Sequence, residues 1–412
     1  MIPRHRPPFD FFQLVSATTR AFSELSVEQV EACFAESLGM SCVWLPSARE
    51  GVTLALRAVR TDDMTVVGPS YTCQVVHEAM VRSGAPVRLI DTDNEGFLMS
   101  QNALQSMQLA DYALILCELF GHAYDLTSLR SNLLSDPRLR IVDAAMTVPV
   151  REVFDRLEKN DFAVVSFGIG KCMYAGWGGM GITRDSGLAD KVRAQRDALL
   201  YTSPRWLALK RGLEIWLRML AHNGRVYGIM RRIKDNLEQS RPCSASDQRS
   251  LGFPLSWNHD HTMTCEWHHP STSIDRHLIM EILGRIHQMQ EGRLANARRY
   301  QDGLSAVRGL KLPSLSPFAM SHYTVRVPGE LRDAVRGALW RSGIDTGTMF
   351  NLPQYLSPDN FPNAYRLSLE VINLPLDASL RAADIDRICY LLGKAVESAW
   401  KRTHGRIIEK SG

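Results

Sequence analysis

The chain has 412 residues, 45% of them hydrophobic and 22% charged, and a formal net charge of +4. A chain of this length can bury a large core and should form a large domain plus a smaller one, whereas so small a charge gives no argument for nucleic acid as a partner. The eight cysteines show no CxxC spacing, and neither a signal core nor a continuous apolar membrane span is visible. We therefore expect a cytoplasmic protein with reduced thiols.

After an N-terminal arm at residues 1–25, short apolar strands alternate with helical or turn segments up to residue 186. The expected strands are Thr65–Val67, Val87–Ile90, Ala113–Cys117, Arg140–Val142 and Ala163–Ser166. Strands that alternate with crossovers form a mainly parallel sheet flanked by helices. Such a sheet binds ligands at the carboxyl ends of its strands. The sequence thus predicts a large α/β domain at residues 26–186.

The segment Pro46–Gly51 opens an amphipathic helix pattern. Ser47 is a suitable N-cap, and the first free N–H groups of the helix, from Ala48 and Arg49 onward, could bind a phosphate. An ordinary helix cap explains Ser47 equally well when it is taken alone.

Asp143 ends the apolar run Leu139–Asp143 and is followed by two alanines. This pattern is typical of a buried strand that delivers a carboxylate beneath a flat ring, although a turn aspartate would look the same. A carboxylate in that place would hold a pyridinium nitrogen protonated, because a nearby negative charge favours the cationic form.

Lys171 follows an apolar strand and precedes the glycine-dense stretch Gly176–Gly181. A lysine in a tight, partly desolvated turn can lose its proton and form a Schiff base with an aldehyde, as lysines that hold pyridoxal phosphate do. A solvated surface lysine is the alternative. The glycines also match a G-x-G-x-x-G string, but they lead into a short strand and turn at Ile182–Asp185 instead of a helix, which argues against a nicotinamide site.

Residues 187–271 form a segment rich in basic residues. Its apolar residues recur at helical spacing: Trp206, Leu209, Leu213, Trp216, Leu217 and Leu220. We expect a helical element that packs on the protein or on a dimer mate, and consider a surface resting on anionic lipids the weaker alternative. The cluster His259, His261, Cys265, His268 and His269 lacks the fixed geometry of known zinc sites, so we expect no metal.

The last part of the chain, residues 272–412, predicts a smaller C-terminal α+β domain. A helical stretch at Arg276–Tyr300 leads to a strand at Tyr323–Val327 and a helix that ends by Gly343. A closing helix follows at Ala383–Arg402.

The order of these segments resembles that of the DegT/StrS sugar aminotransferases, which are pyridoxal-phosphate enzymes of aspartate aminotransferase fold type I. The resemblance covers most of the chain except its middle. It rests on Val66–Thr72, Ser83–Val87, Ile90–Asp93, Leu119–Gly121, Val142–Ala145, Ser166–Lys171, Gly343–Gly347, Phe361–Tyr365 and Asn373–Leu376.

The chain departs from the family at four positions. Cys73 stands where an aromatic residue usually stacks on the cofactor ring, and Met146 replaces the usual Gln or His. Glu118 stands where many members have His, and Arg49 replaces a Thr of the phosphate turn. Cys73 and Met146 are polarizable and could still pack on a ring face. These changes bear on the substrate pocket more than on the Schiff-base chemistry.

The resemblance implies a homodimeric aminotransferase with Lys171 as the catalytic Schiff-base lysine. It also implies that Asp143 tunes the ring and that Ser47, Ala48, Arg49 and Ser166 hold the phosphate. The expected reaction moves an amino group from an amino acid such as glutamate to a nucleotide-linked keto-sugar, in polysaccharide or secondary-metabolite biosynthesis. Two alternatives remain open: a non-sugar keto substrate, and a non-catalytic member that binds the cofactor or a partner.

Overall fold

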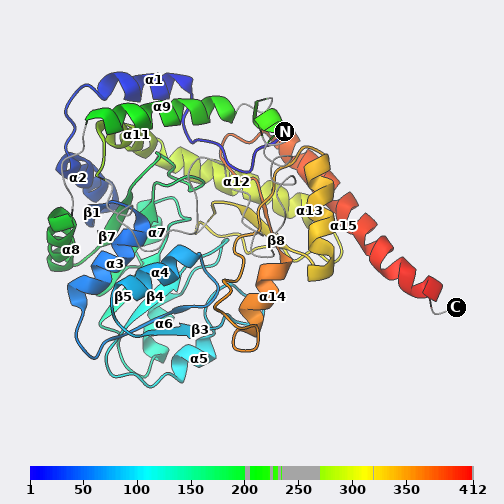
Figure 1. The fold of residues 1–412 in the computed structure, drawn as a ribbon, viewed down its shortest axis with the longest axis horizontal. Helices are drawn as coiled ribbons and strands as arrows, with labels where there is room; N and C mark the ends of the chain where they lie inside the picture. Colours follow the sequence, from blue (N-terminus) through cyan, green and yellow to red (C-terminus); the bar gives the residue numbers. More distant parts are fainter. Residues whose placement is uncertain (200–204, 223–225, 231–232, 234–269, 319, 411–412) are drawn as a thin grey trace.

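The computed structural model describes residues 1–199, 205–222, 226–230, 233, 270–318 and 320–410 (Figure 1). Its large domain is built on a seven-stranded sheet of order β1-β7-β6-β5-β4-β2-β3. The strands are β1 (Ser41–Leu45), β2 (Thr65–Pro69), β3 (Val87–Ile90), β4 (Tyr112–Cys117), β5 (Leu139–Asp143), β6 (Asp161–Ser166) and β7 (Gly179–Thr183). β7 is antiparallel to its neighbours β1 and β6, and the other pairs are parallel. The mainly parallel sheet is therefore confirmed.

Helices cover both faces of this sheet. Helices α3 (Ala48–Val59), α4 (Gln74–Arg82) and α8 (Ser186–Leu199) lie on one face, and α2 (Val27–Leu38) packs against β1 from the other. Shorter helices α5 (Gln101–Gln105), α6 (Leu126–Asn132) and α7 (Arg151–Phe154) complete the connections. Alternate residues of β4 belong to different cores, Leu114 to one and Ile115 to the other, because successive side chains point to opposite faces of a strand.

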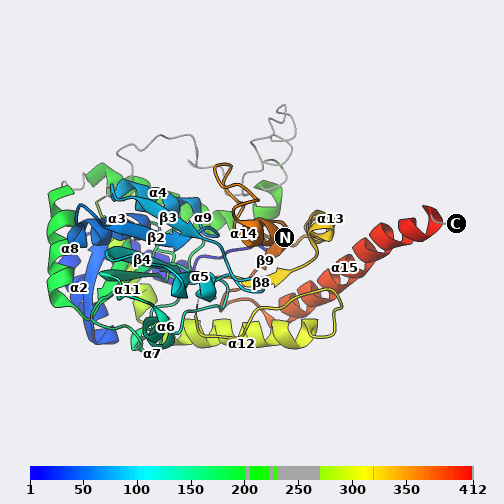
Figure 2. The same ribbon diagram turned by 90° about the horizontal axis from the view of Figure 1, so that it is seen from below.

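The C-terminal part forms a separate core around a two-stranded antiparallel sheet. Its strands are β8 (Tyr323–Arg326) and β9 (Val371–Leu374). Its helices are α12 (Ile286–Leu304), α13 (Gly329–Arg341), α14 (Pro362–Glu370) and α15 (Ala382–Lys410). The long predicted helix is divided into α11 (Ser273–Leu283) and α12, with the break at Gly284 and Arg285. Figures 1 and 2 show α15 projecting away from the body of the molecule.

A carboxylate at the end of β3 ties the two parts together. Asp91 accepts hydrogen bonds from the backbone N–H groups of Asn363 (2.9 Å) and Ala364 (3.0 Å) in the first turn of α14. It also accepts one from the hydroxyl of Ser70 (3.2 Å) at the end of β2. Because a negative charge stabilises the N-terminus of a helix, Asp91 places α14 at the carboxyl edge of the large sheet.

Helix α9 (Arg205–Ala221) is the second helix of the basic segment 187–271. It lies beside α1 (Phe11–Arg20) and α11 (Figure 1). The first helix of this segment is α8, which packs against α3, β1 and β7. The predicted boundary at residue 187 therefore falls inside a helix. Within α9, Ile215 is buried and the indole N–H of Trp216 donates to the hydroxyl of Thr18 (3.1 Å).

We expected this segment to pack on the protein or on a dimer mate, and α9 does pack on its own chain, but three leucines of its apolar face do not. Leu209, Leu213 and Leu220 are 72%, 61% and 58% exposed. The helix docks through Arg211 and Ile215, and the partly buried Trp216 lies beside the exposed leucine stripe.

Candidate active site

The predicted site residues lie where the parallel strands end. Asp143 is the last residue of β5, and its register partner Cys117 is the last residue of β4. Ser166 is the last residue of β6. The carboxyl ends of adjacent parallel strands share one edge of the sheet, so these side chains belong to one neighbourhood.

The first turn of α3 meets this edge through two glycines. Ser47 caps α3, its hydroxyl accepting the N–H of Glu50 (3.2 Å), and it forms a β-bridge with Gly178. Gly179 pairs with Ser166. A Cβ added at Gly179 would lie only 3.0 Å from the backbone N of Ala48 and 2.5 Å from the carbonyl oxygen of Val165. Glycine therefore lets the helix N-terminus and the end of β6 approach closely, and N–H groups of such a turn form an anion site.

Lys171 lies in a compact loop between β6 and β7. Its backbone N–H donates to the carbonyl of Gly168 (3.2 Å), and the N–H groups of Ala175 and Gly176 both donate to the carbonyl of Phe167 (3.0 and 3.1 Å). Gly170 has a φ of 77°, a left-handed conformation that suits glycine. The loop folds back on itself and leaves the lysine side chain partly exposed beside the strand ends.

The ionisation of Asp143 is set by opposing effects. Burial raises the pKa of this carboxyl, whereas the charge of Lys171, the N–H of Ala145 and the thiol of Cys117 lower it. Oδ1 accepts the Ala145 N–H at 3.0 Å, and Oδ2 accepts the Cys117 thiol at 3.7 Å. The charge of Lys171 thus acts on Asp143 across the strand ends, which is consistent with the two side chains lying near one another.

Three further predicted residues lie near the same strand ends. Cys73 is the N-cap residue of α4. Burial lowers the pKa of Arg49, while Cys73 acts in the opposite direction, which places the two side chains near one another. Met146 is buried, and its carbonyl accepts the thiol of Cys172 (3.2 Å), next to Lys171. The structure thus brings the predicted residues to one edge of the sheet.

Two histidines that the sequence did not indicate complete the surroundings of the lysine loop. Nε2 of His322 lies 3.3 Å from Nε2 of His5, although 317 residues separate them in the chain. A Cβ at Gly170 would lie 3.0 Å from Nε2 of His5, so the N-terminal arm rests on the loop. Burial lowers the pKa of His322 well below its ordinary value, and the charge of Lys171 adds to this effect.

Glu118 forms a buried ion pair with Arg156. Its carboxylate is buried and accepts Nη2 of Arg156 at 2.6 Å and the N–H of Tyr124 at 3.3 Å. Burial raises the pKa of Glu118, and Arg156 opposes the shift. The guanidinium of Arg156 also stacks on the ring of Phe318, 4.5 Å from its centroid.

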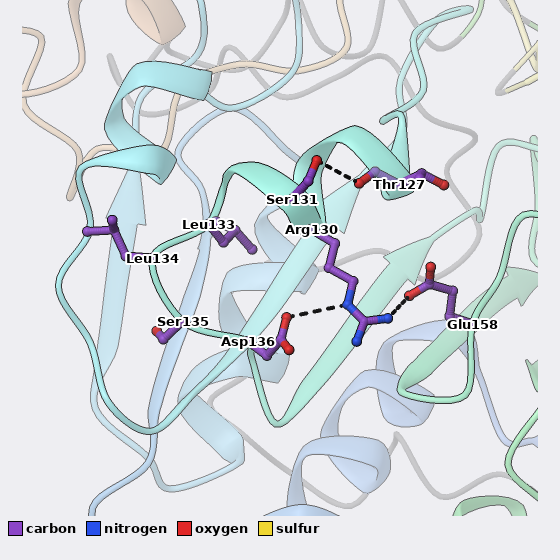
Figure 3. A pocket seen from close by; sticks show the side chains of 8 residues that line it. All are labelled: Thr127, Arg130, Ser131, Leu133, Leu134, Ser135, Asp136 and Glu158. Carbon is purple, nitrogen blue, oxygen red and sulfur yellow. Dashed lines mark hydrogen bonds and ion pairs between the residues drawn. The ribbon is translucent and has the colours of Figure 1, made fainter.

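A hollow of about 540 Å³ lies at the opposite edge of the sheet (Figure 3). Its lining includes Asp136 before β5 and Glu158 before β6, so it belongs to the amino ends of the strands. The side chain of Arg130 lies between them, 3.5 Å from Asp136 and 3.0 Å from Glu158. The hollow is therefore separate from the cluster around Lys171.

The described residues include neither a group of metal-ligating side chains nor a helix long and apolar enough to cross a membrane. The histidine and cysteine cluster at residues 259–269 lies outside the described residues.

Comparison with known proteins agrees with this geometry. The sequence pattern of the DegT/DnrJ/EryC1/StrS aminotransferase family matches residues 18–225 and 274–392. The chain belongs to this family. A comparison with curated proteins finds no match.

Solved structures share the fold over nearly the whole chain. The aminotransferase TlmJ from Streptoalloteichus hindustanus has 19% identity and a TM-score of 0.69, with 97% of this chain and 99% of TlmJ covered. The sugar aminotransferase CalS13 from Micromonospora echinospora has 18% identity and a TM-score of 0.69, with 96% and 100% covered. Helicobacter pylori PseC, an aminotransferase of pseudoaminic acid biosynthesis, has 14% identity and a TM-score of 0.68, with 96% and 99% covered. The protein has PLP transferase fold type I.

The aminotransferase's cofactor is pyridoxal phosphate, and the residues present fit it. The close approach at Gly179 offers an anion site at the first turn of α3. Asp143 offers a carboxylate, and Lys171 an amine, near one another. These are the three groups that a phosphorylated pyridine aldehyde requires.

Proposed function

We propose that this aminotransferase transfers an amino group from an amino acid, glutamate being our candidate, to the keto group of a nucleotide-linked sugar. The reaction would serve polysaccharide or secondary-metabolite biosynthesis in the cytoplasm. The observation that carries the proposal is the convergence of Lys171, Asp143 and the N-terminus of α3 at one edge of the sheet. The sugar class is supported by CalS13 and PseC, which share the fold.

In this proposal different residues of the chain bind the phosphate and the ring of the cofactor. Ser47, Ala48, Arg49 and Ser166 bind the phosphate through backbone N–H groups, hydroxyls and one guanidinium. Asp143 would keep the ring nitrogen protonated, and Cys73 and Met146 would pack against the ring. The bound cofactor supplies an electron sink at the reacting carbon.

Lys171 has two tasks in this arrangement. Its Nζ would hold the cofactor through the aldehyde carbon in the resting enzyme. When it is not bound to the cofactor, the same amine would move a proton at the reacting carbon, first as a base and then as an acid. Asp143 and the buried walls of the site keep this amine beside its target.

Absorbance spectroscopy of the purified holoenzyme tests the proposal. We expect a cofactor band that changes when glutamate is added and returns when a nucleotide-linked keto-sugar follows. A response to other keto compounds alone would favour a non-sugar substrate, which the unusual Cys73 and Met146 make the second candidate. A cofactor band that no amino donor changes would contradict an enzymatic role and favour a cofactor-binding member without turnover.

We also propose that a second copy of the chain covers the exposed stripe of α9. Leu209, Leu213 and Leu220 recur on one side of α9, and Phe12 of the neighbouring α1 is 80% exposed. Large apolar side chains exposed together in this way are typical of an interaction surface. Covering such a surface is favourable because it removes apolar area from water.

The dimer can be tested with a matched pair of variants. Leu213→Glu should shift sedimentation toward the monomer, whereas Leu134→Glu, at a site that is 64% exposed far from α9, should not. If Leu213→Glu stays dimeric and instead loses binding to anionic vesicles, the stripe contacts lipid and the dimer proposal fails.

A further inference from the structure

We propose that Cys117 and Thr72 form a positioning chain, from hydroxyl to thiol to carboxylate, that fixes Asp143 in its orientation and keeps it ionised. This inference rests on the ring-binding role proposed for Asp143. It adds two residues whose side chains act through Asp143 and need not touch the substrate.

The contacts run in one direction through three strand ends. The hydroxyl of Thr72, just after β2, donates to Sγ of Cys117 (3.2 Å). Sγ in turn donates to Oδ2 of Asp143 (3.7 Å), a length that suits the larger sulfur atom. Thr72 and Cys117 are 2% and 1% exposed, so water does not compete for these bonds.

Donor and acceptor counting fixes the polarity of the chain. A threonine hydroxyl and a thiol each carry one hydrogen, and an ionised carboxylate only accepts. Because Thr72 gives its hydrogen to the sulfur, the thiol hydrogen remains for Asp143. Burial raises the pKa of Cys117 well above its ordinary value, and the charge of Asp143 raises it further, so the thiol keeps this hydrogen.

The other oxygen of Asp143 is held independently by the N–H of Ala145 (3.0 Å). The carboxylate is thus held at both oxygens, one by the backbone and one by the side-chain relay. Free lone pairs remain for a ring N–H, since a carboxylate has about four acceptor positions. The thiol therefore acts together with the charge of Lys171 and the N–H of Ala145 against the effect of burial, which raises the pKa of Asp143.

A buried cysteine often acts only as a small apolar side chain, so the variants must separate a packing role from a hydrogen-bonding role. Cys117→Ala removes the donor with little change of volume, and Cys117→Ser restores a donor. Thr72→Val removes the first donor but keeps the shape, and Thr72→Ser keeps the hydroxyl. If the residues serve packing alone, the activities of the four variants should follow side-chain size. If they form the relay, the activities should follow whether the hydrogen-bond donor is kept.

Infrared spectroscopy of the holoenzyme observes the thiol directly. The S–H stretch of Cys117, isolated by subtracting the Cys117→Ala spectrum, should lie at the low frequency of a hydrogen-bonded thiol. It should move to higher frequency in Asp143→Asn, because an amide is the weaker acceptor. A band at the frequency of a free thiol, unmoved by Asp143→Asn, would overturn the inference without bearing on catalysis.

The pH profile provides the second readout. The titratable groups around Asp143 are Lys171, Cys117 and Glu118, with Cys73 beside Cys117. Loss of the thiol donor raises the pKa of Asp143, so the acid limb of kcat/KM and of the cofactor absorbance should move to higher pH in Cys117→Ala and Thr72→Val. Turnover should fall about tenfold in Cys117→Ala, in line with one bond to a charged group, and Cys117→Ser should recover it.

The two failures are distinguishable. Profiles of Cys117→Ala and Thr72→Val that superimpose on the wild type would refute the relay alone. A wild-type protein without any cofactor response would refute the proposed function, while the infrared band would still report on the contact between Cys117 and Asp143.

Discussion

Asp143 shows how a single residue can carry a charge into a buried strand end. Burial opposes its ionisation, and the nearby Lys171, the Ala145 N–H and the Cys117 thiol favour it. The size of the Asp143 side chain contributes to packing, whereas its negative charge would act on a cationic group such as a protonated ring nitrogen. Replacement by the isosteric asparagine separates the two contributions.

We predict that Asp143→Asn folds normally and loses activity. Its melting temperature should stay within a few degrees of the wild type, because side-chain volume is conserved and the Ala145 N–H can still find an oxygen. Transamination should fall roughly a hundredfold, the scale on which removal of one preorganised electrostatic partner acts. Near-native turnover would mean that the carboxylate does not serve the ring.

At this scale the sequence indicated residues that end strands but not those that reach the site from elsewhere. Asp143 ends one apolar run and Lys171 follows another at a short distance, so their position followed from the pattern of the sheet. His5 and His322 are 317 residues apart in the sequence. They meet beside the lysine loop only because the N-terminal arm crosses that loop, and local sequence patterns do not show such a crossing. Cys117 looked like one more apolar strand residue.

At the scale of elements, α9 has one docked face and one bare face. The guanidinium of Arg211 is buried and pairs with the carboxylate of Asp275 in α11. Asp275 also accepts the N–H and the hydroxyl of Thr272, both at 2.8 Å. This buried cluster holds α9 on α11, whereas Leu209, Leu213 and Leu220 are mostly exposed.

We predict that Arg211→Ala destabilises the protein by about 3–5 kcal/mol, because it leaves a buried carboxylate without its cationic partner. The neighbouring Lys210 is exposed, and Lys210→Ala should change stability by no more than about 0.5 kcal/mol. Denaturant unfolding at equal protein concentration measures both. Equal losses in the two variants would contradict the docking of α9 through Arg211.

The sequence was informative about elements in proportion to the regularity of their patterns. The parallel strands were visible because both of their faces are buried, which gives continuous apolar runs. β1 was not anticipated, since its five residues adjoin a helix pattern on either side. The division between α11 and α12 was also missed, because the apolar spacing continues through Gly284. Helical spacing predicted the apolar face of α9 but could not show whether the same chain or a dimer mate covers it.

At the scale of the whole molecule, the N-terminal arm links the small domain to the lysine loop. The N–H of Ile2 donates to the carbonyl of Gly343 (2.8 Å), and the carbonyl of Ile2 accepts the N–H of Asp345 (3.0 Å). A few residues later, His5 lies on Gly170 and contacts His322. The charged groups around this histidine pair are Arg4, Arg293, Lys171 and His222.

We predict that this pair makes the protein less stable in acid. Burial, with the surrounding cations, holds the pKa of His5 and of His322 well below 6.5, so the unfolded chain binds more protons than the folded one as the pH falls below about 6.5. Stability from this source is complete above that pH and should decline by up to about 1.4 kcal/mol per pH unit for each histidine.

The pH dependence can be assigned with His322→Gln, which retains a polar side chain but cannot titrate. The free energy of unfolding of this variant should fall less steeply between pH 7 and pH 5 than that of the wild type. Parallel curves for the two proteins would show that the histidine pair does not control the acid limb.

The covalent link between cofactor and protein is the most direct test of the central claim that Lys171 is the cofactor lysine. Borohydride reduction of the holoenzyme, followed by peptide mapping, should place the pyridoxyl group on Lys171, and Lys171→Ala should abolish both the label and transamination. Recovery of the label on another lysine would contradict the assignment of the site.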